Sequence, residues 1–238
     1  MITAISILLI VIVVVIMIVI QYQIEGEKDM PYQLSKITII STAEGEQNTD
    51  NIEETARWNL SVNQNNDIYF FVDKKSTKDD EFIENVTIEN IDIPKQPLKG
   101  NIKIYMPSSV EGRTFLCDDA YIIEEKLEYK GGTTSNPKTL EIGNQGGSAI
   151  LRFSNNKIGN LISNEDTEIK HDGTLLTRVG ATEDEVKFQV KFDFIIQING
   201  IKYKANITLT LPCNNLCTEG TTTREITDMS NIIFKRAK

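Results

Sequence analysis

The stretch VKFQVKFDFIIQINGIKYKANITLTL, residues 186–211, decides the fold. Apolar and polar residues alternate along both of its arms, from Val186 to Ile198 and from Ile201 to Leu211. Alternation with a period of two is typical of β-strands that have one buried face. Asn199-Gly200 separates the arms and favours a type I′ turn, which needs a positive φ at both positions. The stretch therefore predicts an antiparallel β-hairpin.

The turn at Asn199-Gly200 also predicts the register of the hairpin. Residues paired across it are apolar on one face, as for Ile196 opposite Tyr203. They are polar on the other face, except that Ile195 lies opposite Lys204. A shift by one residue would move the whole apolar set into water. One buried and one solvated face are typical of an antiparallel sheet.

Shorter runs of the same kind occur along the rest of the chain. A change in the phase of the apolar residues predicts a β-bulge near Glu89-Asn90. Many short strands between Gly-, Asn- and Pro-rich turns predict an all-β fold, an antiparallel β-sandwich of the immunoglobulin-like kind. The further candidate strands are residues 34–42, 57–63, 67–73, 85–93, 101–106, 120–129, 148–154 and 175–179. The C-terminal stretch, residues 231–238, is expected to form a last edge strand with a basic end.

Residues 34–238 are expected to form this sandwich. The stretch KGGTTSNPKTLEIGNQGG, residues 130–147, is the candidate boundary that would divide it into two small sandwiches. The alternative is a long loop within one sandwich. We favour the single sandwich because each half carries only about six candidate strands, fewer than an immunoglobulin-sized domain needs.

The N-terminal stretch MITAISILLIVIVVVIMIVI, residues 1–20, has only Thr3 and Ser6 as polar side chains. As a helix, it is about 30 Å long, the hydrocarbon thickness of a bilayer. A cleaved signal peptide would need basic residues before the apolar run and a small-residue cleavage site, and neither is present. The stretch predicts a single transmembrane helix that anchors the chain in the lipid bilayer, with a polar tether at residues 21–33.

The net charge argues against nucleic-acid binding, whereas Lys28 and Lys36 after the helix slightly favour a cytoplasmic domain. The formal net charge is −9 at pH 7, whereas a nucleic-acid-binding protein needs a basic face. Long domains translocate largely regardless of charge, so we expect an extracytoplasmic domain behind the anchor. Heavy use of Ile, Asn, Lys and Glu points to a prokaryotic source.

The three cysteines allow several interpretations. Cys213 and Cys217 are separated by three residues and could close a small disulfide loop in an exported domain. An odd number of cysteines, with Cys117 as the third, does not suggest a disulfide framework. Structural zinc needs four ligands, and His171 is the only histidine of the chain. No cofactor or metal is expected.

One order of residues allows an enzymatic interpretation. His171, the sequence Thr210-Leu211-Pro212-Cys213, and Arg224 follow one another along the chain. This order resembles sortases, membrane-anchored cysteine transpeptidases with a His, a TLxTC motif and an Arg. The resemblance implies a Cys213 thiolate, His171 as the acid and Arg224 at the oxyanion. Pro212 stands where the family has a threonine before the cysteine, and the resemblance covers these residues alone.

Other candidate residues favour structural roles. Ser154 and Lys157 match an SxxK pattern that needs a helix, yet their surroundings predict a strand followed by a turn. Trp58 is expected in the core. Tyr69 and Phe71 lie opposite the apolar face of their strand and indicate either burial on both faces or an exposed aromatic patch. The acidic clusters, at residues 79–81, 118–119, 165–166 and 183–185, are expected to be solvated loops.

Together these features predict a membrane-anchored β-sandwich protein of the cell envelope that acts by binding or scaffolding, not catalysis, with a protein partner at the envelope. The alternative is a subunit of an envelope filament or secretion machine, whose layout of apolar helix and immunoglobulin-like domain is similar. The sortase-like transpeptidase is a second alternative. No catalytic, cofactor or metal residue is assigned.

Overall fold

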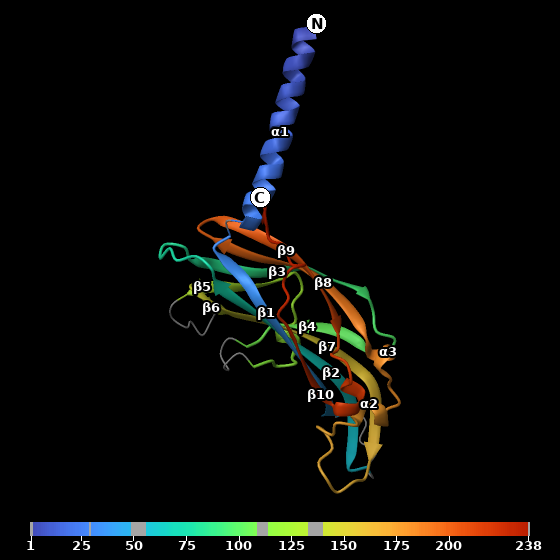
Figure 1. Ribbon diagram of the computed structural model, residues 1–238. Coiled ribbons are helices and arrows are strands. Elements are labelled where there is room, and N and C mark those ends of the chain that lie inside the picture. The colour runs from blue at the N-terminus through green and yellow to red at the C-terminus, as the bar shows by residue number, and fades with distance from the viewer. Residues whose placement is uncertain (1, 29, 49–55, 109–113, 133–139, 238) are drawn as a thin grey trace.

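The computed structural model contains one long helix followed by two β-sheets (Figure 1). It describes residues 2–28, 30–48, 56–108, 114–132 and 140–237, and within the long helix it describes the side chains of residues 5–19 alone. The sheets stack face to face, so the all-β, two-sheet expectation is confirmed.

The five-stranded sheet has the order β10-β1-β2-β7-β4, and the six-stranded sheet has the order β11-β9-β8-β3-β5-β6. Described neighbours are antiparallel, except that β5 and β6 are parallel. The strands are β1 Tyr32–Gln47, β2 Trp58–Lys74, β3 Ile83–Lys95, β4 Asn101–Tyr105, β5 Lys126–Gly132, β6 Glu141–Gly143, β7 Gly146–Ser163, β8 Phe188–Ile198, β9 Ile201–Leu211, β10 Thr221–Ile226 and β11 Lys235–Ala237.

The β8–β9 hairpin has the predicted register over its whole length, from Phe188 opposite Leu211 to Ile198 opposite Ile201. Asn199 and Gly200 have φ values of 48° and 77°, as a type I′ turn requires. The predicted bulge in β3 is also present, because the register with β8 shifts after Glu89 and Asn90 has a φ of 53°.

The main core lies between the two sheets. Phe70 of β2 packs against Phe192 and Phe194 of β8, with ring centroids 5.6 and 5.0 Å apart. Burial of these side chains is the largest favourable contribution to the stability of such a sandwich. The largest fully buried side chains include Tyr32, Tyr129, Phe70, Phe153, Phe188, Phe192 and Phe194.

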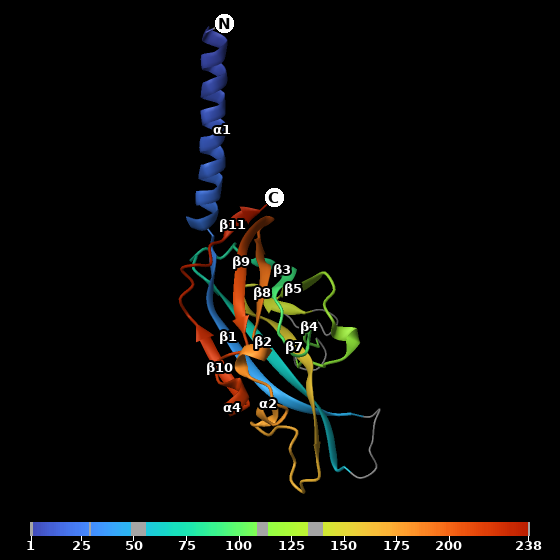
Figure 2. The same cartoon turned by 90° about the vertical axis from the view of Figure 1, so that its right-hand side faces the viewer.

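A second, smaller core lies at the end of the sandwich far from the long helix (Figures 1 and 2). It joins Leu60 and Val62 of β2 to short helices that cover this end. These are α2 Leu175–Arg178, α3 Glu183–Val186 and α4 Leu216–Glu219. The expectation of a strand at residues 175–179 is wrong, because a short apolar run is ambiguous between strand and buried helix.

Two other strand predictions need correction. Residues 57–63 and 67–73 belong to one continuous strand, β2, because polar residues between them interrupt the alternation without ending the strand. Residues 120–129 contain a 3₁₀ turn, Asp119–Tyr121, and only the start of β5. The expected C-terminal edge strand is present as β11, which pairs with β9.

Each sheet takes strands from both sides of residues 130–147. The five-stranded sheet combines β1, β2 and β4 with β7 and β10, and the six-stranded sheet combines β3 and β5 with β8 and β9. A division there would cut both sheets. Residues 133–139 of this candidate boundary lie outside the described residues.

The long helix α1, Ile2–Lys28, projects away from the sandwich (Figure 1). The tether expected at residues 21–33 is therefore helix as far as Lys28, because its Gln, Glu and Lys residues continue a helix readily. Among the residues that the structure describes, no helix is both long and apolar enough to cross a membrane. The transmembrane anchor stays a prediction.

Candidate binding site

A polar cavity of about 470 Å³ lies on the face of the five-stranded sheet that points away from the main core. This face is called the outer face. Side-chain amides dominate the lining of the cavity and come from β1, β2, β4, β7 and the segment after β1. The amide residues are Gln47, Asn48, Asn63, Asn101 and Asn156.

Alternate residues of strand β2 point to opposite faces of the sheet, and this alternation places polar side chains on the outer face. Phe70 and Ile68 point into the main core, so Asp67 and Asn65 point to the outer face. The register between β2 and β7 shifts between Val62 and Gln64, where Lys157 has a φ of 59°. This bulge lets the Lys157 backbone N–H donate to Asn63 Oδ1 at 2.9 Å, which fixes the Asn63 amide at the cavity.

Hydrogen bonds hold the polar side chains in and beside the cavity in place. Asn65 Nδ2 donates to Glu44 Oε2 at 2.9 Å, and Asn63 Nδ2 reaches Glu46 Oε2 at 3.3 Å. The Ser154 hydroxyl lies 2.5 Å from Asn65 Oδ1. Asn63, Asn65 and Ser154 are all buried. Buried side chains that are held by hydrogen bonds of this kind are rigid, which favours a preformed binding site.

Arg152 forms a fixed positive group beside the cavity. Its guanidinium makes a two-point contact with Asp67 at 2.5 and 2.8 Å, and Nη1 lies 3.4 Å from Cys117 Sγ. The ring of Phe115 covers the guanidinium at 4.6 Å. Burial alone would lower the pKa of Arg152, but the Asp67 carboxylate raises it above its usual value, so Arg152 stays charged.

The charged groups that line the cavity nearly cancel. Lys103 pairs with Asp119 at 2.9 Å, and this hydrogen bond raises the pKa of Lys103. Glu46 and Lys157 contribute one charge of each sign. Burial raises the pKa of the Tyr105 hydroxyl, which therefore stays protonated at neutral pH. The cavity thus offers hydrogen-bonding groups without a strong field of either sign.

Polar residues also lie on the inner face of the five-stranded sheet, between the two cores. Asn66 accepts a hydrogen bond from Ser41 Oγ at 2.8 Å and donates one to the Phe153 carbonyl at 3.1 Å. Gln64 is fully buried, and both of its amide atoms lack a partner among the described residues. This buried polar layer was not predicted from the sequence. The signal that could have indicated it is the run Asn63-Gln64-Asn65-Asn66, which interrupts the alternation of apolar and polar residues.

The residues of the sortase-like interpretation are not brought together. The Cys213 thiol is buried and lies 3.5 Å from the Ile39 carbonyl, and Arg224 donates to the Thr210 carbonyl at 2.8 Å. His171 is exposed in a turn. Among the described residues, no hydrogen bond or ion pair joins these three side chains, so nothing there activates the Cys213 thiol.

The predicted Cys213–Cys217 disulfide is not formed, and all three cysteines are free. The reason is that Cys213 belongs to the main core and Cys217, on α4, belongs to the second core. Burial, and then the Glu183 carboxylate, raise the pKa of the Cys217 thiol to about 11. Cys117 is exposed beside the cavity.

The other candidate residues have structural surroundings. Ser154 and Lys157 both lie in strand β7, where a serine and a lysine three positions apart cannot share a helix face. Trp58 is half-buried and its indole N–H donates to the Glu165 carbonyl at 2.9 Å. Tyr69 and Phe71 are half-buried on the outer face, and Lys36 Nζ lies 4.7 Å from the centre of the Phe71 ring.

Several residues of the acidic clusters form ion pairs. Glu165 pairs with Arg178, Asp166 pairs with Arg57, and Glu185 pairs with Lys99 at 3.1 Å. In the described part of the chain, no group of three or more His, Cys, Asp or Glu side chains could hold a metal ion.

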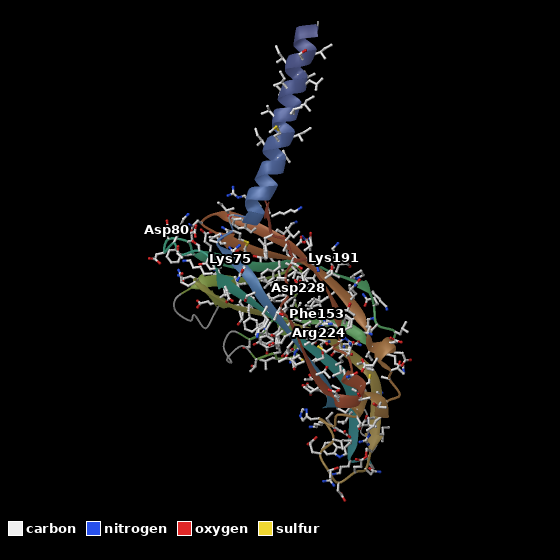
Figure 3. The ribbon with its side chains drawn as sticks, in the orientation of Figure 1. Lys75, Asp80, Phe153, Lys191, Arg224 and Asp228 are labelled. Carbon is white, nitrogen blue, oxygen red and sulfur yellow. The ribbon has the colours of Figure 1, made fainter. Side chains whose placement is uncertain are left out.

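A second cavity, of about 290 Å³, lies at the α1 end of the sandwich, the end that Lys75 and Asp80 mark in Figure 3. Its lining includes the apolar residues Met30, Leu34, Met229 and Ile232. It contrasts with the amide-lined cavity of the outer face.

Comparisons of the chain with models of known protein families, with curated proteins and with solved structures find no match.

Proposed function

We propose that the chain is a membrane-anchored β-sandwich protein of the cell envelope that acts by binding or scaffolding, not by catalysis. The observation that carries this proposal is the separation of α1 from the cores. Every described side chain of α1, residues 5–19, is exposed, and Ser6 is the only polar one among them. The main core begins at Met30. An exposed apolar helix is unfavourable in water, so a bilayer is its proposed environment.

The proposed class of sandwich is immunoglobulin-like. The order β1-β2-β7-β4 corresponds to strands A, B, E and D of a constant-type domain, and the order β9-β8-β3 corresponds to G, F and C. Read along the chain, β1, β2, β3, β4, β7, β8 and β9 then run from A to G. Strands β5 and β6 are an insertion between D and E, and β10 and β11 extend the edges.

The outer-face cavity is the proposed binding site, and the sandwich is proposed to lie outside the cytoplasm. Asn63, which lines the cavity, is held by the Lys157 backbone N–H and the Glu46 carboxylate, and this favours recognition without rearrangement. The alternative role, a subunit of an envelope filament or secretion machine, has the same two-part layout. In that role α1 itself would carry the contacts with other membrane proteins.

Membrane fractionation of cells that produce the full chain, or a chain of residues 30–238, tests the anchor. We expect the full chain to stay in the membrane pellet after an alkaline wash and the shorter chain to be released. A full chain released by the wash would contradict the anchor. Co-purification of other membrane proteins that depends on α1 would favour the machine subunit.

A membrane-impermeant thiol reagent tests the side of the membrane. Cys117 is exposed, whereas Cys213 and Cys217 are buried, so we expect labelling of intact cells at Cys117 alone. The Cys117→Ser variant is the control and is expected to remain unlabelled. Labelling only after lysis would place the sandwich in the cytoplasm.

A further inference from the structure

The lining of the outer-face cavity restricts the chemistry of its ligand. Amide side chains carry both donors and acceptors, and the Ser61 hydroxyl adds one more group of this kind. Among the described residues, no Ile, Leu, Val or Phe lines the cavity, and the Tyr105 side chain that does is buried and leaves little ring surface for stacking. An apolar ligand would therefore gain little on binding.

The charged residues in and beside the cavity disfavour charged ligands. Arg152, which would suit an anion, is already held by Asp67, and Lys103 is already held by Asp119. A phosphate or carboxylate ligand would have to compete with these pairs and would find Lys157 as the one cation among the described lining residues that is outside an ion pair. A cation would have Glu46 as the only carboxylate that the described part of the lining offers, with Lys157 repelling it. The remaining class is a neutral ligand that donates and accepts hydrogen bonds on all sides.

Some lining side chains can still form hydrogen bonds with such a ligand. Asn48 donates its amide N–H to Asn59 at 3.0 Å, which leaves its Oδ1 as an acceptor towards the cavity. Asn101 is exposed at the start of the edge strand β4. A sugar hydroxyl donates and accepts at once, as these groups require. A peptide would in addition need apolar subsites for its side chains, which this lining does not provide.

We propose that the outer-face cavity binds a neutral saccharide unit, either free or within an envelope polysaccharide. This inference rests on the proposed binding function of the cavity and names its ligand class. The volume, about 470 Å³, is within the usual range for small-molecule sites, roughly 300–1,000 Å³.

The test uses the full chain in lipid nanodiscs and isothermal titration with neutral tetrasaccharides built from glucose, mannose or N-acetylglucosamine. We expect at least one of them to bind with a dissociation constant of about 1 mM or tighter. The matching monosaccharide distinguishes the two sources: equal binding indicates a free sugar, and a tenfold gain for the tetramer indicates a chain. No binding of any probe up to about 10 mM overturns the inference.

Asn101→Trp is the test variant, because the side chain is exposed, so a large ring there would block the cavity without disturbing a core. We expect it to weaken saccharide binding at least about tenfold. Asn231→Trp, at an exposed asparagine outside the cavity, is the control and should bind as the unchanged chain does. Saccharide binding that survives Asn101→Trp overturns the inference.

The failure of this inference is distinguishable from failure of the proposed function. A protein partner whose binding is lost in Asn101→Trp, with no saccharide bound, overturns the saccharide inference and keeps the binding function. Release of the full chain from membranes contradicts the anchor alone and leaves the titration result as it stands.

Discussion

The β8–β9 hairpin and the middle of strand β2 are both central parts of a sheet, yet different interactions specify their strand pairing. In the hairpin, one face is apolar and buried while the other is largely polar. In β2, the four residues from Asn63 to Asn66 are polar on both faces, and all four are buried. Burial of one apolar face and the Asn199-Gly200 turn specify the hairpin, whereas side-chain hydrogen bonds specify the middle of β2.

This difference determines how each region should respond to mutation. A shift of the hairpin by one residue would expose its whole apolar face, so its register is strongly specified. A shift of β2 at Asn63–Asn66 would exchange one polar residue for another. There the specificity depends on particular bonds, such as Asn66 to the Phe153 carbonyl and Asn63 to the Lys157 backbone.

The largest decrease in the free energy of unfolding is expected for Ile196→Asp. Ile196 is fully buried in the main core, opposite Tyr203 of β9 and Val86 of β3. An unpaired carboxylate there should cost more than about 4 kcal/mol, enough to unfold a domain of ordinary stability. Urea denaturation followed by circular dichroism checks this.

Thr208→Asp is the matched control on the solvated face of the same hairpin. Thr208 is exposed and lies opposite Lys191, so the free energy of unfolding should change by less than about 0.5 kcal/mol. A folded Ile196→Asp protein would contradict the hairpin register that both sequence and structure give.

The next largest effect is expected for Asn66→Ala. The change removes the acceptor of the Ser41 hydroxyl and leaves the Phe153 carbonyl without its donor, inside the sheet. We expect a loss of about 2 to 3 kcal/mol in the free energy of unfolding. Asn160→Ala, at an exposed asparagine of the neighbouring strand, should change it by less than about 0.5 kcal/mol. Equal effects of the two variants would mean that the polar layer does not stabilise β2.

The same contrast explains what the sequence could predict. The hairpin, the bulge at Asn90 and the edge strand β11 follow from local patterns, and the structure contains all three. Strand β2 was divided into two candidates because its centre has no apolar period. The helix α2 was taken for a strand because four or five apolar-rich residues fit either element.

The candidate site could not be predicted from the sequence, for a different reason. The pairing of β1, β2, β7 and β4 brings together a lining from distant parts of the chain: Glu46, Gln47, Asn48, Ser61, Asn63, Asn101, Lys103, Tyr105, Cys117, Asn156 and Lys157. The local signal was the density of amides at residues 63–66 and 155–156. That signal does not say which amides point outward, because the bulge at Lys157 changes the phase of β7.

A smaller effect, of opposite sign, is expected for Gln64→Leu. The Gln64 amide is fully buried and neither of its atoms has a partner among the described residues. Leucine has a similar volume and no polar atom, so the free energy of unfolding should rise by about 1 kcal/mol. Thermal denaturation measures it. A loss of stability in this variant would show that the amide is satisfied in solution, for example by a buried water.

The last effect depends on pH and concerns the second core, on which the far end of β2 packs. The pKa of the Cys217 thiol is raised to about 11 in the folded chain, chiefly by burial, whereas an unfolded thiol titrates near about 8.5. Between these values the unfolded chain loses the proton and the folded chain keeps it, so the free energy of unfolding falls as pH rises from about 8.5 to 11.

Denaturation across this pH range should therefore show a steeper decline for the unchanged chain than for Cys217→Ala, in which the titrating thiol is absent. Glu183→Gln keeps an acceptor for the Cys217 backbone N–H but removes the carboxylate that adds to the shift, so its decline should lie between the other two. Parallel declines in all three proteins would mean that the Cys217 thiol is solvated and that the second core is looser than the main core.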